Sequence, residues 1–144
     1  MSEASSIVVP KGFRASGVKA GVKPSGGLDL ALIASDVPCS AAGTFTTNRV
    51  CAASVKWCRD IVPTDGVRAI VVNAGNANAA TGAQGEANVR RTAESAAALI
   101  GCDARQVLIA STGVIGHQLP MEKIEAGLRA AAPALSADAE SFRT

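Results

Sequence analysis

The chain has 144 residues, of which 48% are hydrophobic and 3% aromatic, with 14 basic and 12 acidic residues. This composition predicts one folded domain, residues 1–144, with an aliphatic core, because disordered chains contain few apolar residues. The balanced charge argues against a nucleic-acid partner, and no apolar run reaches the roughly 18 residues of a membrane span. Residues 1–12 do not resemble a secretory signal, so we expect a cytoplasmic protein without a nucleic-acid or membrane partner.

The first half of the chain predicts strands and turns. Residues 12–23 mix alternating apolar positions with glycines, and Leu28–Ser35 has the pattern of a strand that ends before Pro38. Residues 44–50 predict a neighbouring strand, because Thr, Phe and Val favour extended backbone. Residues 52–62 fit a helix and a strand equally, and both interpretations stay open.

The second half contains a strand, a glycine-rich loop and a helix. Val67–Gly75 is a continuous apolar run, which is typical of a strand buried on both faces. The loop of residues 75–85 follows, rich in Gly, Asn and Ala. Residues 86–100 carry apolar side chains on one helical face, and Gly101 is expected to end that helix.

The same unit then recurs. Gln106–Ser111 predicts a strand, residues 112–119 a loop, and residues 120–132 a helix with Pro120 at its first position. Two strand–loop–helix units indicate an α/β fold, in which the loops at the carboxyl ends of the strands are the default ligand site. In the tail, Ser136 is expected to cap the start of another helix.

The cysteines do not predict a metal site or a disulfide framework. None of the four is in CxxC spacing, and His117, the one histidine, is the only imidazole that could join them at a metal. We therefore expect no metal and free buried thiols in a reducing cytosol; the four are Cys39, Cys51, Cys58 and Cys102.

The segment Ser111-Thr112-Gly113 allows three interpretations. A phosphate cradle has no motif support, because neither GxxxxGK[ST] nor G-x-G-x-x-G occurs. A nucleophile at Ser111 or Thr112 would need His117 as its base, but no carboxylate is placed to orient that ring. An oxyanion hole needs only fixed donors, which Thr112 (through its N–H or hydroxyl) and the N–H of Gly113 supply. A plain strand–helix turn remains the alternative from pattern alone.

Three asparagines follow the strand Val67–Gly75. Asn73, Asn76 and Asn78 could bind a ligand, although asparagine in turns usually bonds to nearby backbone. An acyl or nucleotide site at this loop stays a further alternative. Three lysines are candidate ligand cations, but each equally fits a solvated strand edge: Lys19, Lys23 and Lys56.

Four stretches together resemble the N-terminal part of the ornithine acetyltransferase family, the bifunctional glutamate N-acetyltransferases of arginine biosynthesis. They are PKGFRASGVKAGVK, DLALIASDVPCSAAGTFTTNRV, VVNAGNANAATGAQGEAN and VLIASTGVIGHQLPMEKI, in family order from Pro10 to Ile124. One departure is Ala80, where many members have cysteine.

The resemblance implies a fold, a reaction and a site. Family members are precursors that cleave themselves into two chains, and the new N-terminal threonine of the second chain is the nucleophile. It accepts acetyl from N-acetylornithine and passes it to glutamate in ping-pong order. In the family the Thr-Gly of Ser-Thr-Gly-Val-Ile-Gly forms the oxyanion hole, which falls on Thr112 and Gly113 here.

The resemblance also implies an assembly. The fold class expected is α/β, an αββα-type sandwich of stacked sheets flanked by helices and completed by the second (beta) chain, in a hetero-oligomer of two alpha and two beta chains. No cofactor is expected, although acetyl-CoA serves some members as an alternative acetyl donor. The family's nucleophile segment lies beyond position 144, so we expect this chain alone to be inactive. The alternative is a non-catalytic binding or assembly domain that retains the family surface.

Overall fold

The computed structural model describes residues 9–143, which contain a four-stranded mixed sheet in the order β1-β2-β3-β4. The strands are β1 (Phe13–Val18), β2 (Leu30–Ala41), β3 (Thr64–Asn76) and β4 (Val107–Val114). The first three run antiparallel to their neighbours, whereas β3 and β4 are parallel. The predicted α/β fold is therefore confirmed.

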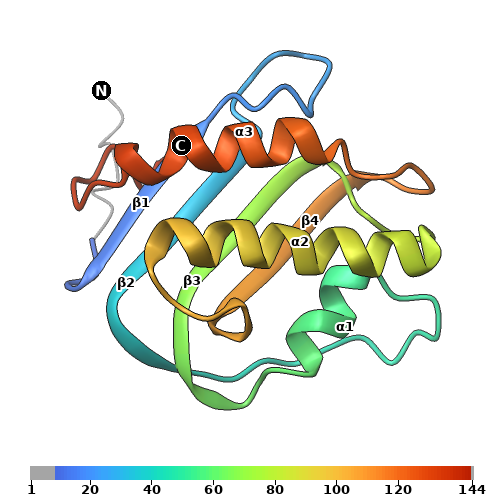
Figure 1. Ribbon diagram of the computed structural model, residues 1–144, viewed down its shortest axis with the longest axis horizontal. Coiled ribbons are helices and arrows are strands. Elements are labelled where there is room, and N and C mark those ends of the chain that lie inside the picture. The colour runs from blue at the N-terminus through green and yellow to red at the C-terminus, as the bar shows by residue number, and fades with distance from the viewer. Residues whose placement is uncertain (1–8, 144) are drawn as a thin grey trace, which may run out of the picture.

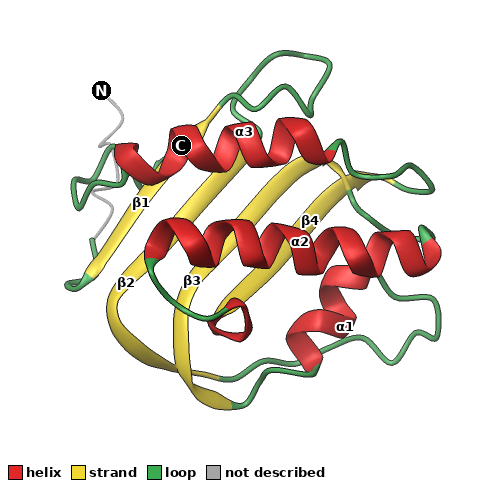
Figure 2. Ribbon diagram, in the orientation of Figure 1, coloured by secondary structure: helices red, strands yellow, loops and turns green. Residues whose placement is uncertain are grey.

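Helices cover one face of this sheet. In Figures 1 and 2, α2 (Gly82–Ile100) and α3 (Met121–Ala131) lie across the strands, and the short α1 (Ala53–Arg59) lies beside β4. The two expected strand–loop–helix units are β3 with α2 and β4 with α3. Since β3 and β4 are parallel neighbours, both loops leave the same edge of the sheet.

The core lies between the sheet and the helices. Leu32, Val71 and Ile109 pair in register across β2, β3 and β4 and are almost completely buried, and they belong to one cluster with Ile124 and Leu128 of α3. Burying each such side chain stabilises the fold by roughly 1.5–3 kcal/mol. The sheet thus depends on α2 and α3 for its stability.

The opposite face of the sheet is apolar but only partly buried. Ile33, Ile70 and Leu108 pair across three strands there and are each half-buried. The strand expected to be buried on both faces, Val67–Gly75, is therefore covered on one face within residues 9–143. A second sheet against this face, which would complete the sandwich, stays a proposal.

Three predictions in the first half need correction or resolution. The strand expected to stop before Pro38 continues to Ala41, because the register shifts after Ala34 and a bulge tolerates proline. Residues 44–50 form no strand, since the Asn48 side chain accepts the Val50 N–H and so gives the backbone a local partner. Residues 52–62, left open above, contain α1.

The helix ends differ slightly from the predicted ones. Gly101 ends α2 with a φ of 77°, as expected, but Pro120 precedes the first helical residue of α3 instead of occupying it. The helix expected after Ser136 does not form. Instead, the Ser136 main chain pairs with Ala15 at the free edge of β1, and its hydroxyl accepts the Asp138 N–H.

Candidate functional site

The segment Ser111-Thr112-Gly113 lies inside β4, not in the loop after it. Its partners on β3 are Asn73, Ala74 and Gly75, so the parallel ladder continues for three residues beyond the predicted end of the strand at Ser111. The interpretation of this segment as a plain strand–helix turn is therefore wrong. The loop begins only after Val114.

Gly113 occupies a position that only glycine can fill. Its φ is 133°, and a Cβ there would lie 2.3 Å from the carbonyl carbon of Gly75 and 2.5 Å from the main-chain nitrogen of Asn76. Side chains rarely adopt this backbone conformation. The two strands consequently approach each other more closely at this point than a side chain would permit.

The amide of Gly113 faces the free edge of β4. On that edge, α1 covers only the first half of the strand: Trp57 Nε1 donates to the Val107 carbonyl, and the Cys58 thiol both accepts from the Ile109 N–H and donates to its carbonyl. Because N–H groups on a strand alternate in direction, the Gly113 N–H points to the same side as that of Ile109. Beyond α1 this side has no neighbouring strand within residues 9–143.

The hydroxyl of Thr112, and not its main-chain amide, is available as a hydrogen-bond donor at this corner. By the same alternation its N–H faces β3, whereas its side chain is exposed and takes part in no hydrogen bond found among residues 9–143. The available donors at this corner are therefore the Thr112 hydroxyl and the Gly113 N–H. Val114 and Ile115, which follow, are 57% and 64% exposed and give the corner an apolar border.

The structure does not assemble a serine–histidine pair. Ser111 Oγ is buried and has no hydrogen-bond partner in the described part of the chain, so His117 does not contact it. The His117 side chain is exposed, and its main-chain carbonyl accepts a hydrogen bond from Asn76. A base-assisted nucleophile at Ser111 has no support in this geometry.

The three asparagines hold the two loops together. Asn76 Nδ2 donates to the carbonyls of His117 and Gln118, each at 3.1 Å, and its Oδ1 accepts the Asn78 N–H. Asn73 donates to the Asn76 carbonyl, and Asn78 exchanges side-chain hydrogen bonds with the start of α2. All three are buried. These hydrogen bonds hold the two loops in place relative to each other.

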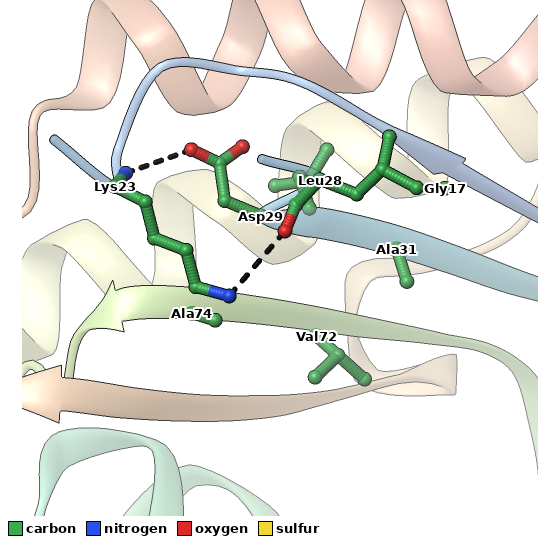
Figure 3. A pocket seen from close by; sticks show the side chains of 8 residues that line it. Gly17, Lys23, Leu28, Asp29, Ala31, Val72 and Ala74 are labelled. Atoms are coloured by element: carbon green, nitrogen blue, oxygen red, sulfur yellow. Dashed lines mark hydrogen bonds between the residues drawn. The ribbon is translucent and has the colours of Figure 1, made fainter. Parts of the chain in front are cut away.

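A cavity of about 320 Å³ opens on the face of the sheet opposite the helices, next to this corner. Figure 3 shows Lys23 reaching over β3 toward Ala74, which is the direct partner of Thr112 in the ladder. Among its other lining residues are Leu28, Asp29, Ala31 and Val72. The cavity therefore reaches β3 at the residue that pairs with Thr112.

Of the three candidate lysines, only Lys23 lines this cavity. Lys56 forms an exposed ion pair with Glu86 at 2.6 Å, and the Lys19 ammonium lies beside Gly26. Residue pattern alone does not distinguish the three lysines. The signal that was missed is Asp29, a buried carboxylate directly before β2, which binds the loop that carries Lys23.

Comparison with known proteins decides the family. The ArgJ family model matches residues 14–144, which is most of the chain. The chain belongs to the ArgJ family. The arginine biosynthesis bifunctional protein ArgJ of Thermosynechococcus vestitus is 50% identical over 133 residues, covering 92% of this chain and 31% of that protein. Its counterpart in Rhodopirellula baltica is 49% identical over 136 residues, 94% of this chain and 33% of the relative.

Solved ArgJ structures share the fold. The ornithine acetyltransferase from Mycobacterium tuberculosis, solved in complex with ornithine, matches with a TM-score of 0.88 and 43% identity, covering 92% of this chain and 72% of that one. ArgJ of Bacillus halodurans matches with a TM-score of 0.83 and 36% identity, covering 91% and 68%. The chain spans about a third of the length of the curated ArgJ relatives it matches.

Metal-binding clusters and membrane-spanning helices are both absent from residues 9–143. No three His, Cys, Asp or Glu side chains in this range are arranged to hold a metal ion. Among the helices in the same range, none has the length and hydrophobicity needed to cross a bilayer.

Proposed function

We propose that this chain is the alpha-chain portion of an acetyltransferase of arginine biosynthesis that moves acetyl from N-acetylornithine to glutamate. Its curated relatives are named arginine biosynthesis bifunctional proteins, and a structural neighbour is an ornithine acetyltransferase bound to ornithine. The nucleophile is the N-terminal threonine of a beta chain cut from the same precursor. Its α-amino group serves as the base, so the chemistry requires no histidine.

In this proposal, Thr112 and Gly113 stabilise the negative charge that develops on the acyl oxygen. The threonine Oγ attacks the acetyl carbon while its proton passes to the α-amino group, and the carbonyl oxygen becomes an oxyanion. The amine of ornithine then takes that proton and leaves as the carbonyl reforms. Glutamate's amine then attacks the acyl-threonine through a second oxyanion and gives up a proton to the α-amino group, and the ester bond breaks as the threonine Oγ leaves and regains its proton. The supporting observation is the Gly113 amide, which the alternation of β4 directs to the free edge of the strand, next to the exposed Thr112 hydroxyl.

The assembly is part of the same proposal. The half-buried apolar face of Ile33, Ile70 and Leu108 is suited to pack against a second sheet, which the beta chain contributes to the αββα sandwich. Two alpha and two beta chains form the cytoplasmic enzyme. It needs no cofactor, and acetyl-CoA is an alternative acetyl donor.

The same apolar face favours one alternative, a non-catalytic assembly domain that retains the family surface. Intact mass and subunit composition separate the two possibilities. A co-purifying chain that begins with threonine supports the enzyme, whereas a lone 14.4 kDa chain that binds N-acetylornithine supports the alternative.

The experiment that tests the proposed role is Thr112→Ala in the complete two-chain enzyme, with Thr112→Ser as the matched control. Loss of one oxyanion donor typically lowers kcat by about 10²–10³. Serine keeps the hydroxyl and should retain most of the activity. An unchanged kcat in Thr112→Ala would reject the role.

A further inference from the structure

An exposed apolar pair directly follows the candidate oxyanion donors. Val114 and Ile115 come immediately after Gly113 in the chain, and each is more than half exposed. Among the large hydrophobic side chains that are exposed in residues 9–143, these two are the only ones adjacent in sequence. Single exposed hydrophobic residues are common on protein surfaces, whereas a contiguous pair beside a candidate site is suited to contact an apolar group.

The main chain on both sides of this pair is held in place. The Val114 carbonyl accepts the Ala77 N–H at 3.0 Å, and the Gly116 N–H donates to the Ala79 carbonyl at 2.9 Å. Val114 is also the last residue of β4 in the parallel ladder, where it lies opposite Asn76 of β3. The two apolar side chains therefore project from a fixed backbone, and their position relative to the Gly113 amide is set before any ligand binds.

Chain connectivity limits how far Val114 lies from the oxyanion donors. The Cα atoms of Gly113 and Val114 are about 3.8 Å apart, and those of Thr112 and Val114 are at most about 7 Å apart. An acyl oxygen bound by the donors lies about 2.7–3.1 Å from the Gly113 nitrogen, and the methyl carbon of an acetyl group is about 2.4 Å from that oxygen. The methyl group therefore lies within about 5.5 Å of the Gly113 nitrogen, within reach of the Val114 side chain.

The chemistry of the acyl carbon decides which group meets the apolar pair. In the tetrahedral intermediate this carbon carries the oxyanion, the oxygen of the nucleophile, the amine of the amino acid and the methyl group. The methyl group alone is apolar, and its removal from water against Val114 and Ile115 is favourable. The amino-acid part carries charges that would lose hydration against the same side chains. The pair is therefore suited to the methyl group.

We propose that Val114 contacts the methyl group of the acyl substrate and, with Ile115 beside it, restricts the enzyme to acetyl over longer acyl groups. The identity of the acyl group rests on the proposed function, whereas the apolar wall rests on the exposure and fixed backbone of the pair. A third acyl carbon would extend the group by about 1.5 Å toward Val114. The wall cannot easily withdraw, because the hydrogen bonds to Ala77 and Ala79 hold its main chain.

The test compares N-acetylornithine with N-propionylornithine as donors to glutamate in the complete two-chain enzyme. We expect kcat/KM in wild type to favour acetyl by about 10- to 100-fold, the range that one methylene gives in an apolar pocket. Val114→Ala should remove most of this preference, and Ile115→Ala should remove less of it. Val114→Thr, which keeps the size of the side chain, should retain the preference while lowering kcat/KM for both donors. The control Val37→Ala, at another exposed valine, should leave the preference unchanged.

The outcomes separate this inference from the proposed function. If wild type shows no preference for acetyl, or if Val114→Ala retains it in full, the apolar wall is overturned, whatever Thr112→Ala does to turnover. If wild type transfers neither acyl group, the proposed function fails and this inference fails with it. If Val114→Ala retains the preference but weakens assembly of the two chains in analytical ultracentrifugation, the pair contacts the other chain and the inference is overturned. Should Val114→Ala not fold, Ile115→Ala with the same donors decides.

Discussion

Gly75 and Gly113 lie opposite each other in the parallel pair of β3 and β4, and a Cβ on Gly113 would collide with the Gly75 backbone. Both residues have positive φ angles, 104° and 133°. The absence of a side chain at Gly113 lets β4 stay paired with β3 at this point, and the alternation of the strand directs the Gly113 amide to the free edge. The geometry of the candidate site therefore requires glycine at both positions.

Gly113→Ala tests this contact. We expect it to destabilise the protein by about 3 kcal/mol or more, because it adds a backbone collision to the strain of a disfavoured φ. Gly116→Ala is the matched control. Its φ is also positive, 83°, but a Cβ there meets nothing within 4 Å, so only strain of about 1 kcal/mol remains. Equal losses in chemical denaturation would contradict the close contact.

Asn76→Asp tests the link between the two loops. Asn76 Nδ2 donates to two carbonyl oxygens, and a carboxylate oxygen in its place would repel both. We expect a loss of about 2–3 kcal/mol in the free energy of unfolding at pH 7. Asn48→Asp should cost little, because the exposed Asn48 uses its oxygen to accept the Val50 N–H, which a carboxylate does equally well. Similar losses in both variants would argue against the role given to Asn76.

Asp29→Asn, with stability measured against pH, tests the hydrogen bonds by which the Asp29 carboxylate holds the main chain of Ala20 and Lys23. The pKa of Asp29 is lower in the folded protein than its ordinary value, so its contribution is fully present above about pH 4 and is lost as pH falls through the folded pKa. At pH 7 the variant should be roughly 1.5–3 kcal/mol less stable than wild type. The difference should shrink as the solution is acidified below pH 4. A difference that is independent of pH would show that the negative charge of Asp29 does not strengthen these hydrogen bonds.

The fold was largely predictable from local patterns, and the errors have identifiable causes. The apolar run Val67–Gly75 lies within β3, which extends from Thr64 to Asn76, and Gly101 ends α2 as predicted, because both signals are local. The end of β4 was predicted three residues too early, since its continuation depends on a partner, β3, that extends equally far. Ser136 was assigned to a helix because its pairing with Ala15 across the sheet leaves no local signal.

The candidate site was predictable only in part. Resemblance placed it at Thr112 and Gly113, but residue pattern alone could not assign the threonine hydroxyl instead of its amide, since that choice follows from the direction of β4. Lys23 was one of three equivalent lysines in the sequence. What distinguishes it is the fold of residues 20–23 around Asp29, which brings it over Ala74.

The rate at which Cys58 is alkylated tests how closely α1 covers the edge of β4. Burial raises the pKa of its thiol, which is also engaged with the main chain of Ile109. We expect iodoacetamide at pH 8 to modify Cys58 more slowly than Cys51, because the thiolate is the reactive form. Peptide mass mapping against time gives both rates, and mild denaturant should remove the difference. Equal rates in the native protein would contradict the contact between α1 and β4.

The most direct test of the central claim is a crystal structure of the complete two-chain enzyme with a phosphonate analogue of the tetrahedral intermediate. The account predicts that the anionic oxygen of the analogue lies about 2.7–3.1 Å from both the Gly113 nitrogen and Thr112 Oγ1. An analogue whose oxygen is bound elsewhere, with the Gly113 amide bonded to the protein itself, would contradict it.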